Sequence, residues 1–167
     1  MRVLTIILVI LSGSIPSFSQ TAEDFFYSGV EKGEHNDCLG AIKDYSKSIE
    51  LDPYKSVSYL NRGLCKHELQ DYYGAIADFT KAIELNPKDA TAYYLRGWCK
   101  AILQDYYGAI ADCTKSIELD SKLKLAYNIR GIAKLKLNQK ESACLDFSKA
   151  GELGLEQVYE VIRKYCY

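Results

Sequence analysis

The sequence has little of what nucleic-acid binding, histidine chemistry and linker-rich folds require. Lysine and arginine number 21 against 22 acidic residues, so no cationic excess exists to neutralise phosphates, and nucleic acid is not an expected partner. Only two histidines are present, which limits any histidine-based metal site, and three prolines exclude collagen-like and linker-rich classes. Six cysteines in 167 residues fall below the density of a disulfide-scaffold miniprotein.

Long hydrophobic runs are also scarce, and the one that stands out is at the N-terminus. Residues 3–11 are mostly apolar, follow Arg2, and precede a small-residue stretch that ends at Ser19. This layout predicts a secretory signal peptide over residues 1–19, cleaved before Gln20. The run is about half the ~20 residues that span a membrane, so we expect no stable insertion after cleavage. We therefore expect an exported protein, periplasmic or secreted; an uncleaved anchor or a buried N-terminal strand is the alternative.

The remaining composition is that of a globular chain, with 48% apolar and 26% charged residues. Three segments of it, residues 59–79, 93–113 and 127–147, align without gaps at a spacing of 34 residues. Small residues keep this register, as in Gly63, Gly97, Gly131, Ala75, Ala109 and Ala143. The same spacing reaches Gly29 and Ala41, which indicates a diverged fourth copy that begins near residue 22. A fixed period of this size is the signature of a repeat array.

The repeated columns resemble the tetratricopeptide repeat (TPR) family, whose pattern has an aromatic residue, Gly, Ala, a second aromatic residue and Pro at this period. The first aromatic column holds Phe25, Tyr59, Tyr93 and Tyr127, and the second holds Tyr45, Phe79, Cys113 and Phe147. Departures are Ser121 and Leu155 in place of the closing proline, and Arg62, Arg96 and Arg130 before the glycine. The resemblance implies an all-α solenoid of four helix-turn-helix repeats, at 22–55, 56–89, 90–123 and 124–157, plus a C-terminal capping helix within 155–167.

Local signals support two helices per repeat. Apolar residues between positions 75 and 83 recur at spacings of three and four, which is helical periodicity. Asp71 and Asp105 are suited to cap the second helix of their repeats, and Pro53 and Pro87 stop it. A single helix pair leaves one face uncovered, so stacking of neighbouring copies is expected.

In this family the first helices line the concave side of the solenoid, and the resemblance implies that partners bind there. The matching positions are Phe26, Val30, Leu60, Leu64, His67, Tyr94, Trp98, Ile102, Asn128, Ile132 and Leu135. Because this set is apolar and includes Tyr and Trp, we expect a groove centred on Tyr94 and Trp98 for an apolar peptide or helix. The alternative is that these residues pack between repeats or under a terminal helix.

One TPR subfamily binds the C-terminal carboxylates of chaperones through Lys, Asn and Arg side chains. The matching positions here are Phe26, Val30, Asn61, Thr91 and Leu95, and only Asn61 fits. Since the cationic members are absent, charge-assisted capture of a carboxylate is not expected.

The cysteines of an exported chain invite disulfides. Cys38 and Cys65 lie on helix faces that could meet, and we consider a bridge between them. Cys166 could pair with Cys144 or with another chain, whereas Cys113 replaces a core aromatic residue and is expected to be a small buried hydrophobe.

No metal, nucleotide or nucleophile motif is recognisable, so neither catalysis nor a cofactor is expected. The sequence thus predicts a non-catalytic scaffold that binds a protein or peptide partner on the concave surface. The alternative is a self-associating structural component of an envelope or secreted assembly, which would be a homo-oligomer.

Overall fold

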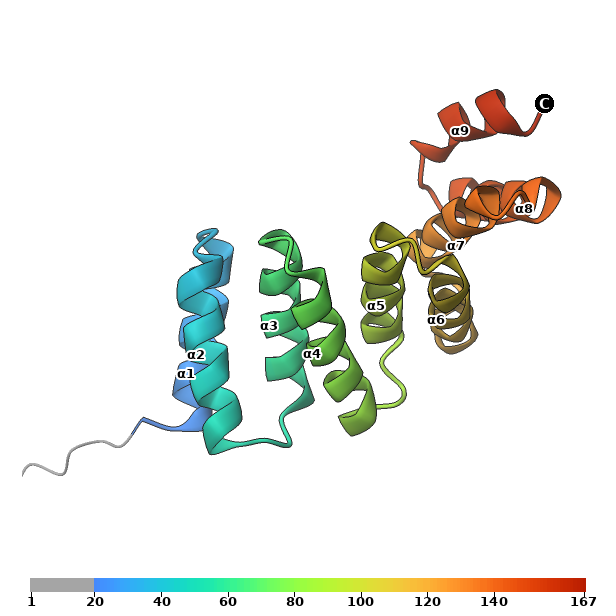
Figure 1. Cartoon of the computed structure of the whole chain (residues 1–167). Helices are drawn as coiled ribbons and strands as arrows, with labels where there is room; N and C mark the ends of the chain where they lie inside the picture. Colours follow the sequence, from blue (N-terminus) through green and yellow to red (C-terminus); the bar gives the residue numbers. More distant parts are fainter. Residues whose placement is uncertain (1–19) are drawn as a thin grey trace, which may run out of the picture.

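A computed structural model describes residues 20–167. Within that range the chain forms nine α-helices and no strand, which confirms the predicted all-α class. The helices are α1 (Ala22–Glu34), α2 (Cys38–Leu51), α3 (Ser56–Glu68), α4 (Tyr72–Leu85), α5 (Ala90–Ile102), α6 (Tyr106–Leu119), α7 (Lys124–Lys136), α8 (Lys140–Glu152) and α9 (Val158–Tyr165) (Figure 1). The predicted signal peptide, residues 1–19, lies outside the described residues.

Aspartate side chains start the second helix of the first three pairs. Asp71 and Asp105, the two predicted caps, accept hydrogen bonds from the backbone amides of Gly74 and Gly108, each at 2.9 Å. Asp37 caps α2 in the same way. These bonds satisfy amide groups that the first helical turn leaves without an intrahelical partner, so they fix where each second helix begins.

The ends of the helices also follow from local residues. Asn86 ends α4 directly before Pro87, because proline cannot continue the helical hydrogen-bond ladder. Between the two helices of each pair, one residue takes a left-handed backbone conformation. These residues are Asn36, Gln70, Gln104 and Asn138, with φ from 59 to 65°. The left-handed residue ends the first helix and lets the chain reverse within a short turn.

A glycine in each first helix lets the second helix pack closely. A Cβ atom added at Gly63 would lie 2.7 Å from Cε1 of Phe79, whose side chain is fully buried. In the third repeat the equivalent Gly97 faces the sulfur of Cys113, which is also fully buried. Cys113 is therefore the small core residue that the sequence predicts.

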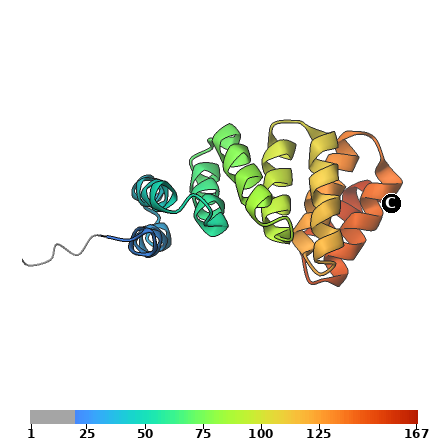
Figure 2. The same ribbon diagram turned by 90° about the horizontal axis from the view of Figure 1, so that it is seen from below.

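The pairs stack in chain order, so their interior is continuous. α2 contacts α3, α4 contacts α5, and α6 contacts α7. One buried cluster runs across the second, third and fourth pairs, with Phe79, Leu95, Cys113 and Ile129 among its members. Figures 1 and 2 show the pairs following one another along the array, from α1 and α2 at one end to α7, α8 and α9 at the other. This is the architecture of a helical solenoid, in which each unit is stabilised by its neighbours.

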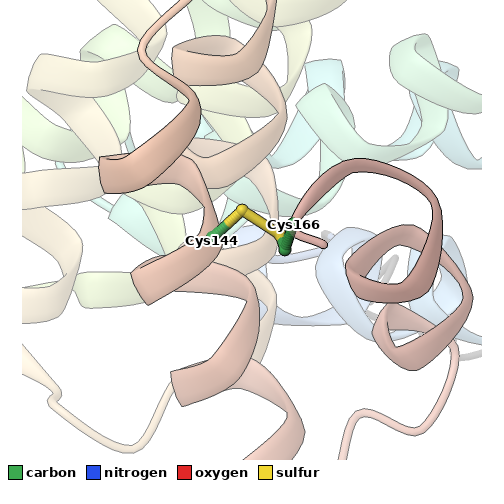
Figure 3. Close-up of a disulfide and its surroundings, with 2 residues drawn as sticks. All are labelled: Cys144 and Cys166. Atoms are coloured by element: carbon green, nitrogen blue, oxygen red, sulfur yellow. A yellow bond between two sulfur atoms is a disulfide. The ribbon is translucent and has the colours of Figure 1, made fainter.

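Helix α9 closes the C-terminal end of the array. It packs against α8, with Val158 buried in a cluster that also holds Phe147. A disulfide joins Cys144 of α8 to Cys166, just after α9 (Figure 3). This pairing is one of the two that the sequence allows for Cys166.

The bridge considered between Cys38 and Cys65 does not form in the structure. Both residues are free thiols, together with Cys99 and Cys113. The two helix faces do meet, because Cys38 packs against the buried cluster that holds Cys65. The two residues thus lie in one cluster without a bond between their sulfur atoms.

Among the helices of residues 20–167, none has the length and apolar character needed to cross a bilayer.

Candidate functional site

A repeated network of ion pairs and hydrogen bonds joins neighbouring repeats. Arg62 donates from Nε and Nη2 to the two carboxylate oxygens of Asp78, at 2.9 and 2.7 Å. Its Nη1 donates to the hydroxyl of Ser46 in the preceding repeat, at 3.0 Å. Lys66 completes the network with an ion pair to Asp78 at 2.7 Å. Arg62 thus bonds to Asp78 in its own repeat and to Ser46 in the preceding repeat, so its side chain links the two repeats.

The same network recurs twice. Arg96 bonds to Asp112 and Thr80, and Arg130 bonds to Asp146 and Thr114. The arginine column is visible in the sequence, but its role in joining repeats was not predicted. The available signal is the aspartate that follows each arginine by 16 residues. The first repeat has Ser28 at this position and has no preceding repeat to contact within the described residues.

The first helices of the four pairs form one face of the array, which we call the inner face. α1 contacts α3, α3 contacts α5, and α5 contacts α7, whereas successive second helices make no comparable contact within residues 20–167. The array therefore curves toward the first helices. Two rows of equivalent positions cross this face: Phe26, Leu60, Tyr94 and Asn128, and then Val30, Leu64, Trp98 and Ile132.

The residues predicted to bind a partner differ in exposure. Tyr94 and His67 are buried, with 8% and 9% of their surface exposed, and Ile102 is exposed. The others are half-buried: Phe26, Val30, Leu60, Leu64, Trp98, Asn128, Ile132 and Leu135. The burial of Tyr94 and His67 is what packing between repeats would give.

The middle of the inner face is filled by aromatic rings. Tyr94 and Trp98 stack with their centroids 6.1 Å apart, and His67 of α3 lies 4.1 Å from Trp98 of α5. Both ring nitrogens of His67 are buried without a hydrogen-bond partner. Tyr94 and Trp98, where the sequence predicts the centre of a groove, therefore pack at the junction between α3 and α5.

Two hollows lie on either side of this aromatic cluster. The one between α1 and α3, which we call the N-terminal hollow, has a volume of about 620 Å³. Its lining residues are Val30, Gly33, Glu34, Asn36, Cys38, Tyr45, Asn61, Leu64, Cys65, Glu68 and Leu69. The buried and half-buried lining residues, which we call its floor, include Val30, Tyr45, Leu64 and Cys65, whereas the exposed residues at its rim include Glu34, Asn36 and Glu68.

The other hollow, which we call the C-terminal hollow, lies between α7 and the capping helix α9. It measures about 430 Å³. Its lining residues are Leu125, Asn128, Ile132, Leu155, Gln157, Val158 and Val161. Two of the predicted binding residues, Asn128 and Ile132, thus line this hollow, and Leu64 lines the N-terminal one.

The floor of the N-terminal hollow is electrically neutral near pH 7. Burial raises the pKa of the Cys65 thiol to about 12, and burial also raises the pKa of the Tyr45 hydroxyl to about 12. Both groups therefore keep their protons at neutral pH. The floor offers apolar contact and weak hydrogen bonds, and Glu34 and Glu68 supply the charge of the hollow.

The side chains of the described region do not form a recognisable metal centre. No group of three or more His, Cys, Asp or Glu side chains that could hold a metal ion occurs within residues 20–167. What the inner face offers is shape, apolar surface and charge.

Comparisons with known proteins agree with this architecture. Two family models, each described as tetratricopeptide repeat, match residues 56–89 and 79–111. A search of curated proteins gives no match. Among solved structures, MamA is 23% identical with a TM-score of 0.78, and the match covers 83% of this chain and 76% of MamA.

Two further structures are complexes. The first TPR of Spaghetti, bound to the HSP90 peptide SRMEEVD, is 28% identical with a TM-score of 0.69, over 72% of this chain and 95% of that one. The TPR2B domain of yeast Sti1, in a pHsp70 complex, is 24% identical with a TM-score of 0.66, over 69% and 97%. The chain thus contains tetratricopeptide repeats, and residues 20–167 fold as a TPR-type helical solenoid with a C-terminal capping helix.

Proposed function

We propose that this protein is an interaction scaffold whose inner face binds a peptide segment of a partner protein, and that it acts by binding and not by catalysis. The observation that carries the proposal is the pair of hollows, about 620 and 430 Å³, on the one face that the first helices form. Concave, largely apolar sites with a few polar groups are where proteins usually take ligands. Side chains of an extended peptide would enter the two hollows.

The similar structures support a peptide as the ligand. The TPR of Spaghetti holds a peptide of seven residues, and it superposes on 72% of this chain. Its ligand does not transfer directly, however. The positions that match the carboxylate-binding residues of the family carry Phe26, Val30, Asn61, Thr91 and Leu95, without a lysine or arginine.

A selection from a random peptide library, displayed against the purified chain, tests the proposal. We expect enriched peptides to lose about tenfold in affinity for Leu64→Gln and for Asn128→Ala, one variant in each hollow, a loss of about 1.4 kcal/mol. Tyr107→Ala and Leu145→Ala are matched controls, because both side chains are exposed on second helices. Thermal melting of each variant checks folding. Equal losses in the controls, or no enriched peptide, would contradict the proposal.

Export through residues 1–19 is part of the same proposal. It is supported by the sequence layout of that segment, with Arg2 before an apolar run and small residues before Gln20. Mass spectrometry of the protein from its native host should give a chain that starts at Gln20. A chain that still carries Met1 would contradict export by cleavage.

A further inference from the structure

The N-terminal hollow carries charge of one sign only. Glu34 and Glu68 line it, and no lysine, arginine or histidine does. The two glutamates are the last residues of α1 and α3 and occupy equivalent positions of neighbouring repeats. A ligand in this hollow therefore lies beside two acidic residues.

The lysines of the same helices do not neutralise these carboxylates. Lys32 of α1 is held by Asp44, and Lys66 of α3 is held by Asp78 at 2.7 Å. Glu68 has a weak contact, 3.8 Å, with the Nδ1 atom of the neighbouring His67. Glu34 forms no ion pair within residues 20–167. The rim of the hollow therefore keeps its negative charge.

This acidic character is restricted to one end of the inner face. At the position of Glu34 and Glu68, the third repeat has Ile102 and the fourth has Lys136. The residues that line the C-terminal hollow are all uncharged. The inner face thus has an acidic hollow at one end and an uncharged, mostly apolar hollow at the other, so the two ends of a bound peptide meet different surfaces.

We propose, on the basis of the peptide-binding function proposed above, that the N-terminal hollow receives a lysine or arginine side chain of the partner peptide. The aliphatic stem of such a side chain packs on Val30 and Leu64, and its charged end lies between the carboxylates of Glu34 and Glu68. An acidic peptide is disfavoured, because its carboxylates would face two like charges. An uncharged apolar side chain of the same peptide occupies the C-terminal hollow.

The test uses the 12-residue peptide that binds best after selection from a random library. We expect it to contain lysine or arginine, and to lose about fivefold in affinity for Glu34→Gln or Glu68→Gln and about twentyfold for the double variant. The affinity of the unaltered chain should fall with added salt more steeply than that of the double variant. The peptide SRMEEVD should bind neither protein.

Matched controls keep the charge change but move it away from the hollow. Glu84→Gln and Glu118→Gln remove exposed glutamates from the second helices α4 and α6 and should leave the affinity within about twofold. Cys38 gives an independent readout, because this half-exposed thiol lines the hollow. The bound peptide should slow alkylation of Cys38 by iodoacetamide.

The two proposals fail in different ways. A selected peptide that lacks basic residues, or that binds the double variant as tightly as the unaltered chain, overturns the basic-residue proposal. If the same peptide still loses affinity for Leu64→Gln or Asn128→Ala, the peptide-binding function stands. If the library yields no binding peptide, both proposals fall.

Discussion

At the scale of the residue, the fold depends on glycines that leave room for a neighbouring ring. Gly63→Ala places a Cβ atom against the fully buried Phe79, so we expect a loss of about 1–3 kcal/mol in unfolding free energy. Gly33→Ala is the matched control, because its Cβ would lie 3.9 Å from the nearest atom, the hydroxyl oxygen of Tyr45. Urea unfolding should show this variant unchanged or up to about 1 kcal/mol more stable. Equal stability of the two variants would contradict the close packing.

The buried aspartates are the second residue-scale requirement. Asp112→Ala leaves Arg96 and Lys100 facing each other without their shared carboxylate. We expect a loss of about 3 kcal/mol in unfolding free energy, since breaking a buried ion pair leaves uncompensated charge. Glu118→Ala removes a carboxylate from the same helix, but its pair with Lys115 is exposed, and the cost should stay below about 1 kcal/mol. Comparable losses in the two variants would show that the network contributes little.

The buried thiols make stability depend on alkaline pH. Burial raises the pKa values of Cys65, Cys99 and Cys113 from 9.0 to about 12. Well below pH 9 the thiols are protonated in both the folded and the unfolded state. Above it the unfolded chain releases protons that the folded chain retains, so unfolding becomes more favourable.

The urea midpoint should therefore fall as pH rises from 8 to 10, and it should fall less steeply for Cys99→Ala, which removes one buried thiol. A midpoint that does not change over this range would contradict the burial of the thiols.

At the scale of the element, helix α9 depends on its disulfide. Reduction of the bond between Cys144 and Cys166, which are 22 residues apart, should weaken the docking of α9 on α8 by about 2–4 kcal/mol. Limited trypsin digestion should then cleave faster after Arg163 and Lys164, while the preceding repeats stay intact. Cys38→Ser is the control and should respond to reduction like the unaltered chain, because Cys38 is free. Equal cleavage rates with and without reductant would contradict this role of the disulfide.

Helix ends could be predicted from the sequence, whereas the cysteine pairing could not. Helix ends at Asp71, Asp105 and Asn86 follow from capping and proline rules, which act within a few residues. The disulfide depends instead on how α9 folds back over α8. That return passes through Gly154, which has a φ of 86°, and is fixed by tertiary packing around Val158. The sequence therefore allows the pairing of Cys144 with Cys166 but does not select it.

At the scale of the whole molecule, the ends of the array differ from its middle. The first repeat has Ser28 where the others have an arginine that reaches the preceding repeat, and α9 covers the last repeat. Both features argue against a stack that is extended end to end by further copies of this chain.

Some residues of the two hollows could be predicted from the sequence, and others could not. The period of 34 residues places Leu64, Asn128 and Ile132 on one face, and the structure places them in the hollows. The period does not reveal that Trp98 packs against both Tyr94 and His67 and that these rings fill the middle of the face. That packing depends on the distance between α3 and α5. The C-terminal hollow needs α9 as its second wall, and the position of α9 is again set by tertiary packing.

Peptide binding on the inner face is the central claim, and amide hydrogen exchange tests it most directly. Exchange is measured for the full chain with and without the best peptide from the library. Binding on the inner face predicts slower exchange in α1, α3 and α7, where these helices line the two hollows, and unchanged exchange along α4 and α6. Protection confined to α4, α6 and α8 would place the peptide on the opposite face and contradict the claim.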